Sequence, residues 1–217
     1  MRKAQGRRCR AIFFAASIAI ALLVSGCNQS SGKRDVRIRP LPPDGAPALR
    51  RVVDSANRQT EQTRYYDASY VQIGYPGGDV PIERGACTDV VIRAFRQGGV
   101  DLQKEVHEDM LRDFSAYPTK WGLKSPDPNI DHRRVPNLMT FFERKGKSLP
   151  VINKTEDYLP GDVVTWDLGG GSTHIGMVSN VWSDEAKAYL VVHNIGDGAK
   201  LENVLFAWRV TGHYRYF

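Results

Sequence analysis

Apolar positions recur with helical spacing in the first half of the chain. Within 87–97 the apolar residues fall on one face, and a glycine pair at 98–99 ends the segment. Similar patterns predict further helices over about 48–63, 103–114 and 136–145, the last of which starts at Pro136.

From about residue 148 the apolar residues form short runs of strand type separated by turns. Runs at 163–166, 174–179 and 188–193 each follow a turn, and 205–216 supplies one or two more strands. Helices followed by a meander of strands indicate an α+β domain. We expect N-terminal helices that pack on a small antiparallel β-sheet.

The first 26 residues are typical of a bacterial lipoprotein signal peptide. Five basic residues precede an apolar run at 11–24, which is shorter than the roughly 20 residues of a membrane-spanning helix. Val24-Ser25-Gly26-Cys27 follows and resembles the bacterial lipobox, in which the cysteine is lipidated and becomes the mature N-terminus. An ordinary secretory signal and a short uncleaved anchor are the alternatives.

Residues 27–47 are predicted to form a lipidated N-terminus and flexible tether, because they are polar and rich in proline. Asn28 stands where Asp is the inner-membrane retention signal of some lipoproteins, which favours the outer membrane. The folded domain is then 48–217. We expect a protein of the bacterial envelope that is anchored by its N-terminal lipid and faces the periplasm.

The net charge changes this picture little. The 217 residues include 30 Lys and Arg against 24 Asp and Glu, a net charge of +6. Five of the basic residues lie within 1–26, which leaves 25 basic and 24 acidic residues in the remainder. A nearly neutral mature chain disfavours nucleic-acid binding. A content of 41% hydrophobic and 25% charged residues excludes a wholly disordered or multi-span membrane chain.

The three cysteines point to a chemical role for one of them. Cys9 lies in the signal peptide and Cys27 is the expected lipid site, so Cys87 has no disulfide partner. Cys87 begins the predicted helix 87–97, where the helix dipole and free amides favour a thiolate. A nucleophile is one interpretation of Cys87, and a small buried core residue is the other.

Two histidines are placed to serve such a nucleophile. His174 opens one predicted strand and His193 ends the next, so an antiparallel pair brings them within hydrogen-bonding reach. A cysteine, a histidine base and a second polar group that orients the base form a working catalytic set. Asn194 is the alternative to His193 as the orienting residue, since strand alternation lets only one of them point at His174.

These residues carry a resemblance to a known superfamily. The order of a cysteine at a helix start, Pro160-Gly161-Asp162, His174-Ile175-Gly176-Met177-Val178 and a strand ending in His193-Asn194 resembles NlpC-type papain-like cell-wall peptidases. The stretch 75–217 looks closer still to a bacterial domain-of-unknown-function family within that superfamily. The resemblance implies a papain-like fold, with Cys87 as nucleophile, His174 as base and His193 as third residue. Around the nucleophile, Ala86-Cys87-Thr88-Asp89 replaces the common pattern Asp-Cys-Ser-Gly.

Two further residues are candidates for substrate binding. Tyr75 lies near the position where NlpC-type sites carry a tyrosine, and an aromatic residue that packs before the turn at 76–78 is the alternative. Asp89 could contact His174, a substrate amine or the first amides of its own helix. Asn194 is a third candidate if it does not orient the base.

We therefore expect an envelope-anchored cysteine amidase or peptidase that acts on peptidoglycan stem peptides or cross-links through an acyl-enzyme. No His-Glu-x-x-His or Cys-x-x-Cys motif is present, so neither a metal nor a cofactor is expected. The alternatives are a catalytically inactive envelope-binding module of the same fold and a thiol acyltransferase or esterase that acts on lipids. The oligomeric state stays open.

Overall fold

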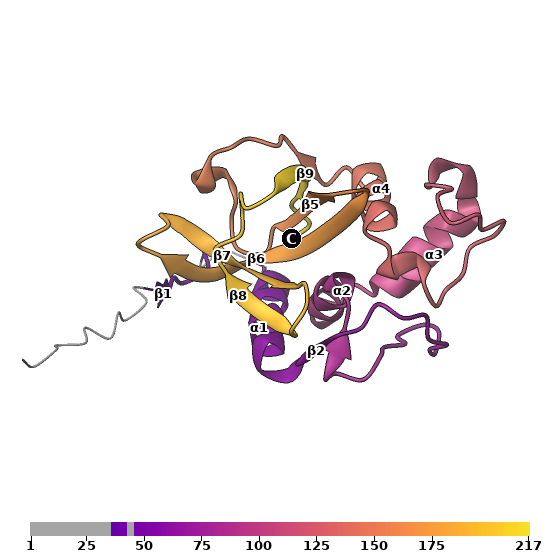
Figure 1. Ribbon diagram of the computed structural model, residues 1–217, viewed down its shortest axis with the longest axis horizontal. Coiled ribbons are helices and arrows are strands. Elements are labelled where there is room, and N and C mark those ends of the chain that lie inside the picture. The colour runs from indigo at the N-terminus through magenta and orange to yellow at the C-terminus, as the bar shows by residue number, and fades with distance from the viewer. Residues whose placement is uncertain (1–35, 43–45) are drawn as a thin grey trace, which may run out of the picture. The chain divides into compact units, whose positions relative to one another are not determined.

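A computed structural model describes residues 36–42 and 46–217 (Figure 1). The expected signal peptide and the lipid site Cys27 lie outside the described residues. Within the described part, no helix has both the length and the apolar character needed to cross a membrane.

In the described part of the chain, four α-helices precede most of the strands, and all four fall where the apolar periodicity predicts them. They are α1 (Pro47–Gln62), α2 (Cys87–Gln97), α3 (Leu102–Arg112) and α4 (Val135–Arg144). A proline in the first turn starts both α1 and α4. Three 3₁₀ helices lie between and after them: η1 (Phe114–Ala116), η2 (Asp131–Arg133) and η3 (Thr155–Asp157).

Seven strands form one sheet, in which every ladder is antiparallel. They are β1 (Val36–Ile38), β4 (Ser148–Leu149), β5 (Val163–Gly169), β6 (Ser172–Ser183), β7 (Ala188–Asn194), β8 (Ala199–Glu202) and β9 (Arg209–Tyr214). The order is β4-β9-β5-β6-β7-β8, and β1 pairs with β6 beside this path. A separate parallel pair joins β2 (Tyr65–Tyr66) to β3 (Arg84–Gly85). The α+β class is therefore confirmed.

The sheet buries apolar side chains on both faces. On one face, α1 and α2 lie side by side against the sheet (Figure 1), and residues such as Val90, Phe95, Ile175 and Met177 form the main core. On the other face, a second cluster centres on Trp166 and is completed by residues of the sheet and of the loops before β5 and β9: Tyr158, Val164, Val178, Val191 and Leu205. Neighbouring residues of β6 therefore face different clusters, as the alternation of strand side chains requires.

The folded unit begins earlier than the sequence pattern predicts. β1 lies within the stretch expected as a tether, and it pairs with residues 181–183 of β6. Arg39 extends this attachment, since its amide donates to the Asn180 carbonyl at 2.9 Å and its guanidinium lies over the Trp182 ring. β5 pairs with β6 only as far as Met177, so the outer part of β6 has a free edge that β1 occupies. The described residues from Val36 to Phe217 accordingly belong to one compact unit.

Candidate active site

The candidate nucleophile Cys87 is the first residue of α2, as predicted. The preceding Ala86 has an extended backbone and follows Gly85 of β3 directly. Asp89 stabilises this tight strand-to-helix turn, because its carboxylate accepts a hydrogen bond of 2.6 Å from the Ala86 amide. Only glycine fits at position 85, where a Cβ atom would lie 2.9 Å from the Cβ atom of Asp89.

The thiol of Cys87 differs from the thiolate that its helix position predicts. Cys87 is only 5% exposed, and burial raises the pKa of its thiol to about 12. Hydrogen bonds from the backbone amides of Ile175, Thr88 and Cys87 itself lower that pKa, whereas the nearby Asp89 carboxylate raises it. Desolvation outweighs the helix amides, so the resting site holds a neutral thiol.

The contact with the Ile175 amide places Cys87 at the segment of β6 that carries His174, because these two residues are neighbours in sequence. β6 and β7 pair Gly176 with His193, and the two histidines are diagonal neighbours across this ladder. His174 Nε2 lies 2.9 Å from His193 Nδ1. The structure thus pairs His174 with His193 and places Cys87 against the backbone of Ile175, the residue that follows His174.

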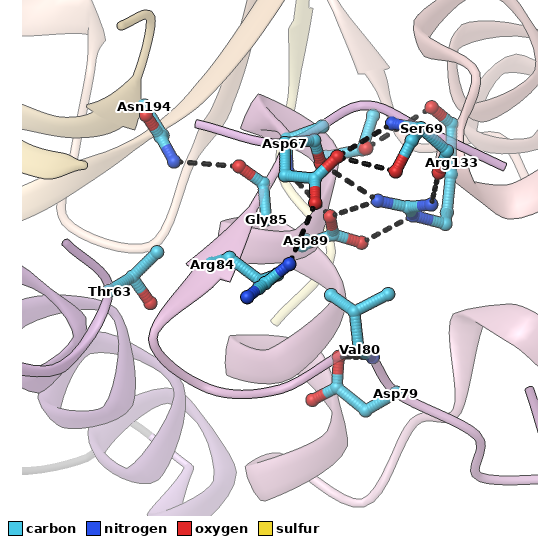
Figure 2. Close-up of polar contacts among 12 residues, drawn as sticks. Thr63, Asp67, Ser69, Asp79, Val80, Arg84, Gly85, Asp89, Arg133 and Asn194 are labelled. Atoms are coloured by element: carbon cyan, nitrogen blue, oxygen red, sulfur yellow. Dashed lines mark hydrogen bonds and ion pairs between the residues drawn. The ribbon is translucent and has the colours of Figure 1, made fainter. Parts of the chain in front are cut away.

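Asn194 takes a different position from His193. It is fully buried, and its side-chain amide donates a hydrogen bond of 2.8 Å to the carbonyl of Gly85, two residues before Cys87 (Figure 2). Asn194 therefore holds β3 and the start of α2 against the end of β7, while His193 contacts the candidate base.

Glu202 extends the polar chain and was not selected from the sequence. Its carboxylate Oε2 lies 3.0 Å from His193 Nε2, on the side of the ring away from His174. β8 delivers this residue, because β7 and β8 pair His193 with Lys200 and Val191 with Glu202. The Gly-Asp-Gly turn at 196–198 was the available signal for this hairpin.

Both histidines are held in the neutral form. Burial, together with the positive charge that His193 would carry, lowers the pKa of His174 to about 3. Burial also lowers the pKa of His193, although Glu202 acts in the opposite direction. Trp166 and Trp208 cover the pair, with ring centroids 5.6 and 5.8 Å from that of His174. The indole rings keep bulk water from the imidazoles and so sustain the desolvation.

Asp89, two residues after Cys87, belongs to a buried ion pair with Arg133, which also binds the carbonyl groups of residues 67 and 69 (Figure 2); we call this group the clamp. Arg133 of η2 binds the Asp89 carboxylate with two hydrogen bonds of 2.9 and 2.8 Å. The same guanidinium donates to the carbonyl oxygens of Ser69 at 2.8 Å and Asp67 at 3.2 Å. Of the contacts considered for Asp89, the structure shows the one to the start of its own helix. The clamp joins α2 to the loop between β2 and β3.

The tyrosine beside Cys87 is Tyr66. Burial raises the pKa of Tyr66, and the charges of Cys87 and Asp89 add to that rise. Tyr66 lies on β2 opposite Gly85. Tyr75 instead packs its ring against His107 of α3, with centroids 5.1 Å apart. Tyr75 was predicted from its distance to Cys87 along the sequence. That distance gives no information about the pairing of β2 with β3, which places Tyr66.

No three His, Cys, Asp or Glu side chains gather as ligands for a metal ion within residues 36–42 and 46–217. The only cysteine thiol of this part of the chain is that of Cys87, which is free.

Comparison of the sequence with known protein families identifies the family of this chain. It belongs to the family described as Domain of unknown function (DUF1287), whose profile matches residues 53–216. The chain is also similar to the Uncharacterized protein YijF of Escherichia coli (strain K12). The two are 57% identical over 166 residues, which cover 76% of this chain and 80% of that protein.

Proposed function

We propose that this chain is a papain-like cysteine hydrolase of the NlpC type that cleaves amide bonds of peptidoglycan stem peptides or cross-links. One observation carries the proposal. A cysteine at a helix start meets the strand of a histidine that is hydrogen-bonded to a second histidine, and this arrangement matches a nucleophile, a base and an orienting group.

The proposed reaction starts from a neutral thiol and a neutral imidazole. His174 takes the thiol proton as the Cys87 sulfur attacks the carbonyl carbon of an amide, and the carbonyl electrons move to oxygen. Backbone amides at the start of α2 stabilise this oxyanion. The carbon–nitrogen bond then breaks, and His174 returns its proton to the leaving amine. Water, deprotonated by His174, hydrolyses the thioester and releases a carboxylic acid and the thiol.

The neutral resting forms of Cys87 and His174 bear on the step at which the thiol proton is transferred. Burial raises the pKa of the Cys87 thiol and lowers the pKa of His174, and both shifts disfavour a thiolate–imidazolium pair in the resting site. We therefore propose that proton transfer accompanies the attack on the carbonyl. Tyr66, beside Cys87, is the residue that we assign to substrate contact in place of Tyr75.

The choice of substrate follows from the expected location. The N-terminal pattern with Cys27 supports a lipid anchor in the bacterial envelope facing the periplasm, with the outer membrane favoured by Asn28. Peptidoglycan is the abundant peptide-bearing polymer of that compartment. We therefore propose that the partners are peptidoglycan or a peptide substrate and the membrane that holds the lipid.

Digestion of purified muropeptides tests the function. The mature protein is incubated with muropeptides, and products are identified by mass spectrometry. We expect new fragments from the unmodified protein and none from Cys87→Ala or His174→Ala. His107→Gln is the matched control, because His107 lies on α3 beside Tyr75. Masses that do not change relative to Cys87→Ala would refute peptidoglycan hydrolysis.

A second candidate function is favoured by the burial of Cys87. A thiol that is 5% exposed suits a catalytically inactive envelope-binding module of the same fold. An electrophilic thiol probe separates the two functions. Labelling of Cys87 that His174→Ala abolishes supports an enzyme, and labelling that this change leaves untouched supports the binding module. A parallel incubation with acyl lipids tests the remaining alternative, a thiol acyltransferase or esterase.

A further inference from the structure

We infer that Glu202 is a positioning residue that selects the tautomers of both buried histidines and thereby leaves His174 Nδ1 free to accept a proton. The catalytic consequence rests on the proposed function, whereas the tautomers themselves do not. The inference follows from the order of three groups along one hydrogen-bonded chain, from Glu202 through His193 to His174.

The first step concerns Glu202 and His193. The Glu202 side chain is 43% exposed and lines a surface cavity of about 630 Å³, so water reaches it. An ionised carboxylate has no proton and can only accept a hydrogen bond. His193 Nε2, 3.0 Å from Oε2 of Glu202, must therefore carry a proton.

The second step derives the tautomer of His174 from the tautomer of His193. A neutral imidazole has a proton on one ring nitrogen and a lone pair on the other. Since His193 Nε2 carries the proton, His193 Nδ1 accepts, and the donor across the 2.9 Å contact is His174 Nε2. The proton of a neutral His174 is then on Nε2, and Nδ1 keeps its lone pair.

The reverse order would also satisfy the contact between the histidines. In that order His193 Nδ1 would donate to His174 Nε2, and His174 Nδ1 would be protonated and unable to act as a base. It would also direct the lone pair of His193 Nε2 at the Glu202 carboxylate, which is repulsive. Glu202 is thus the group that keeps His174 Nδ1 unprotonated and able to act as a base.

The other groups around His193 do not make this selection. Lys200, which pairs with His193 across the β7–β8 ladder, lowers the pKa of His193 but makes no hydrogen bond with its ring among the contacts of the described residues. Trp208 covers both rings, with a centroid 6.1 Å from that of His193. These neighbours keep His193 neutral, and the carboxylate decides which nitrogen holds the proton.

The test is ¹⁵N NMR of the histidine rings in the mature chain in detergent micelles, with resonances assigned through His174→Gln and His193→Gln. We expect both rings of the unmodified protein to be protonated at Nε2. Glu202→Gln should produce a mixture of tautomers, since an amide both donates and accepts. Glu185→Gln, at the same cavity, should leave the spectrum unchanged.

The activity arm uses the muropeptide digest. Glu202→Gln should lower kcat by up to about ten- to hundredfold, the range found when a metal-bound histidine loses the carboxylate that orients it. The inference is overturned if His174 in the unmodified protein is protonated at Nδ1, or if Glu202→Gln leaves both tautomers as they were. If Glu202→Gln does not fold, the spectrum of the unmodified protein decides. Expected tautomers without hydrolysis by any variant would refute the proposed function and leave the tautomer selection standing.

Discussion

Replacement of Arg133 by alanine should cost more stability than any surface ion pair can. Arg133 and Asp89 are 3% and 4% exposed, and the guanidinium makes four hydrogen bonds to Asp89, Ser69 and Asp67. Arg133→Ala leaves a buried carboxylate that keeps only its bond to the Ala86 amide. Loss of one partner of a buried pair costs about 3–5 kcal/mol. A urea midpoint shift of roughly 2 M follows for an m-value near 2 kcal/mol/M.

Urea unfolding followed by tryptophan fluorescence measures this cost. Arg37→Ala is the matched control, because the Arg37–Asp184 pair has side chains 60% and 22% exposed and should contribute less than about 1 kcal/mol. The double variant Asp89→Asn with Arg133→Met removes both charges and should recover much of the loss. The reasoning is refuted if Arg133→Ala and Arg37→Ala unfold at the same urea concentration.

Three further predictions concern the site and its support. Alkylation of Cys87 should accelerate about tenfold per pH unit from pH 7 to 10, because burial raises the pKa of the thiol to about 12; a rate that levels off below pH 9 would contradict this. Gly176→Ala places a Cβ atom 2.9 Å from the Val192 carbonyl oxygen, and thermal melting should show a loss of about 1–3 kcal/mol. Gly196→Ala, whose Cβ atom meets nothing within 4 Å, is the control, and equal melting temperatures of the two variants would refute the clash. Burial raises the pKa of Asp131 from 3.8 to about 6, so its stabilising contribution is complete below pH 3.8 and is lost as the pH rises through 6. Asp131→Asn should therefore raise the free energy of unfolding by about 1–3 kcal/mol at pH 8 and leave it nearly unchanged at pH 4; an equal effect at both values would show that the charge is not the cause.

Local periodicity predicted the elements that bury a complete face. The four helices and the strands β5, β6 and β7 each contain enough apolar residues to reveal their period. The three exposed residues of β1 and the four residues of β8 carry no such signal. Both strands form because β6 and β7 offer a free edge, and that edge exists only once the sheet has assembled.

In the candidate site, too, contacts within a hairpin could be predicted from the sequence and long-range contacts could not. His174 and His193 could be paired from the sequence because a hairpin makes their proximity a local matter. The Arg133–Asp89 pair spans 44 residues, and the place of Tyr66 beside Cys87 depends on the parallel pairing of β2 with β3. Sequence spacing contains no information about contacts of that range.

Cys87 shows most clearly what each level of information decided. The sequence by itself determined that an unpaired cysteine begins a helix and that a histidine pair follows on a hairpin, because helix starts and hairpins depend on neighbouring residues. Only the tertiary structure decided the state of that thiol, since burial against β6 raises its pKa to about 12 despite the helix amides. It also decided that a carboxylate nine residues beyond His193 completes the polar chain. Desolvation and long-range pairing arise from the packed fold as a whole, and the order of residues alone does not contain them.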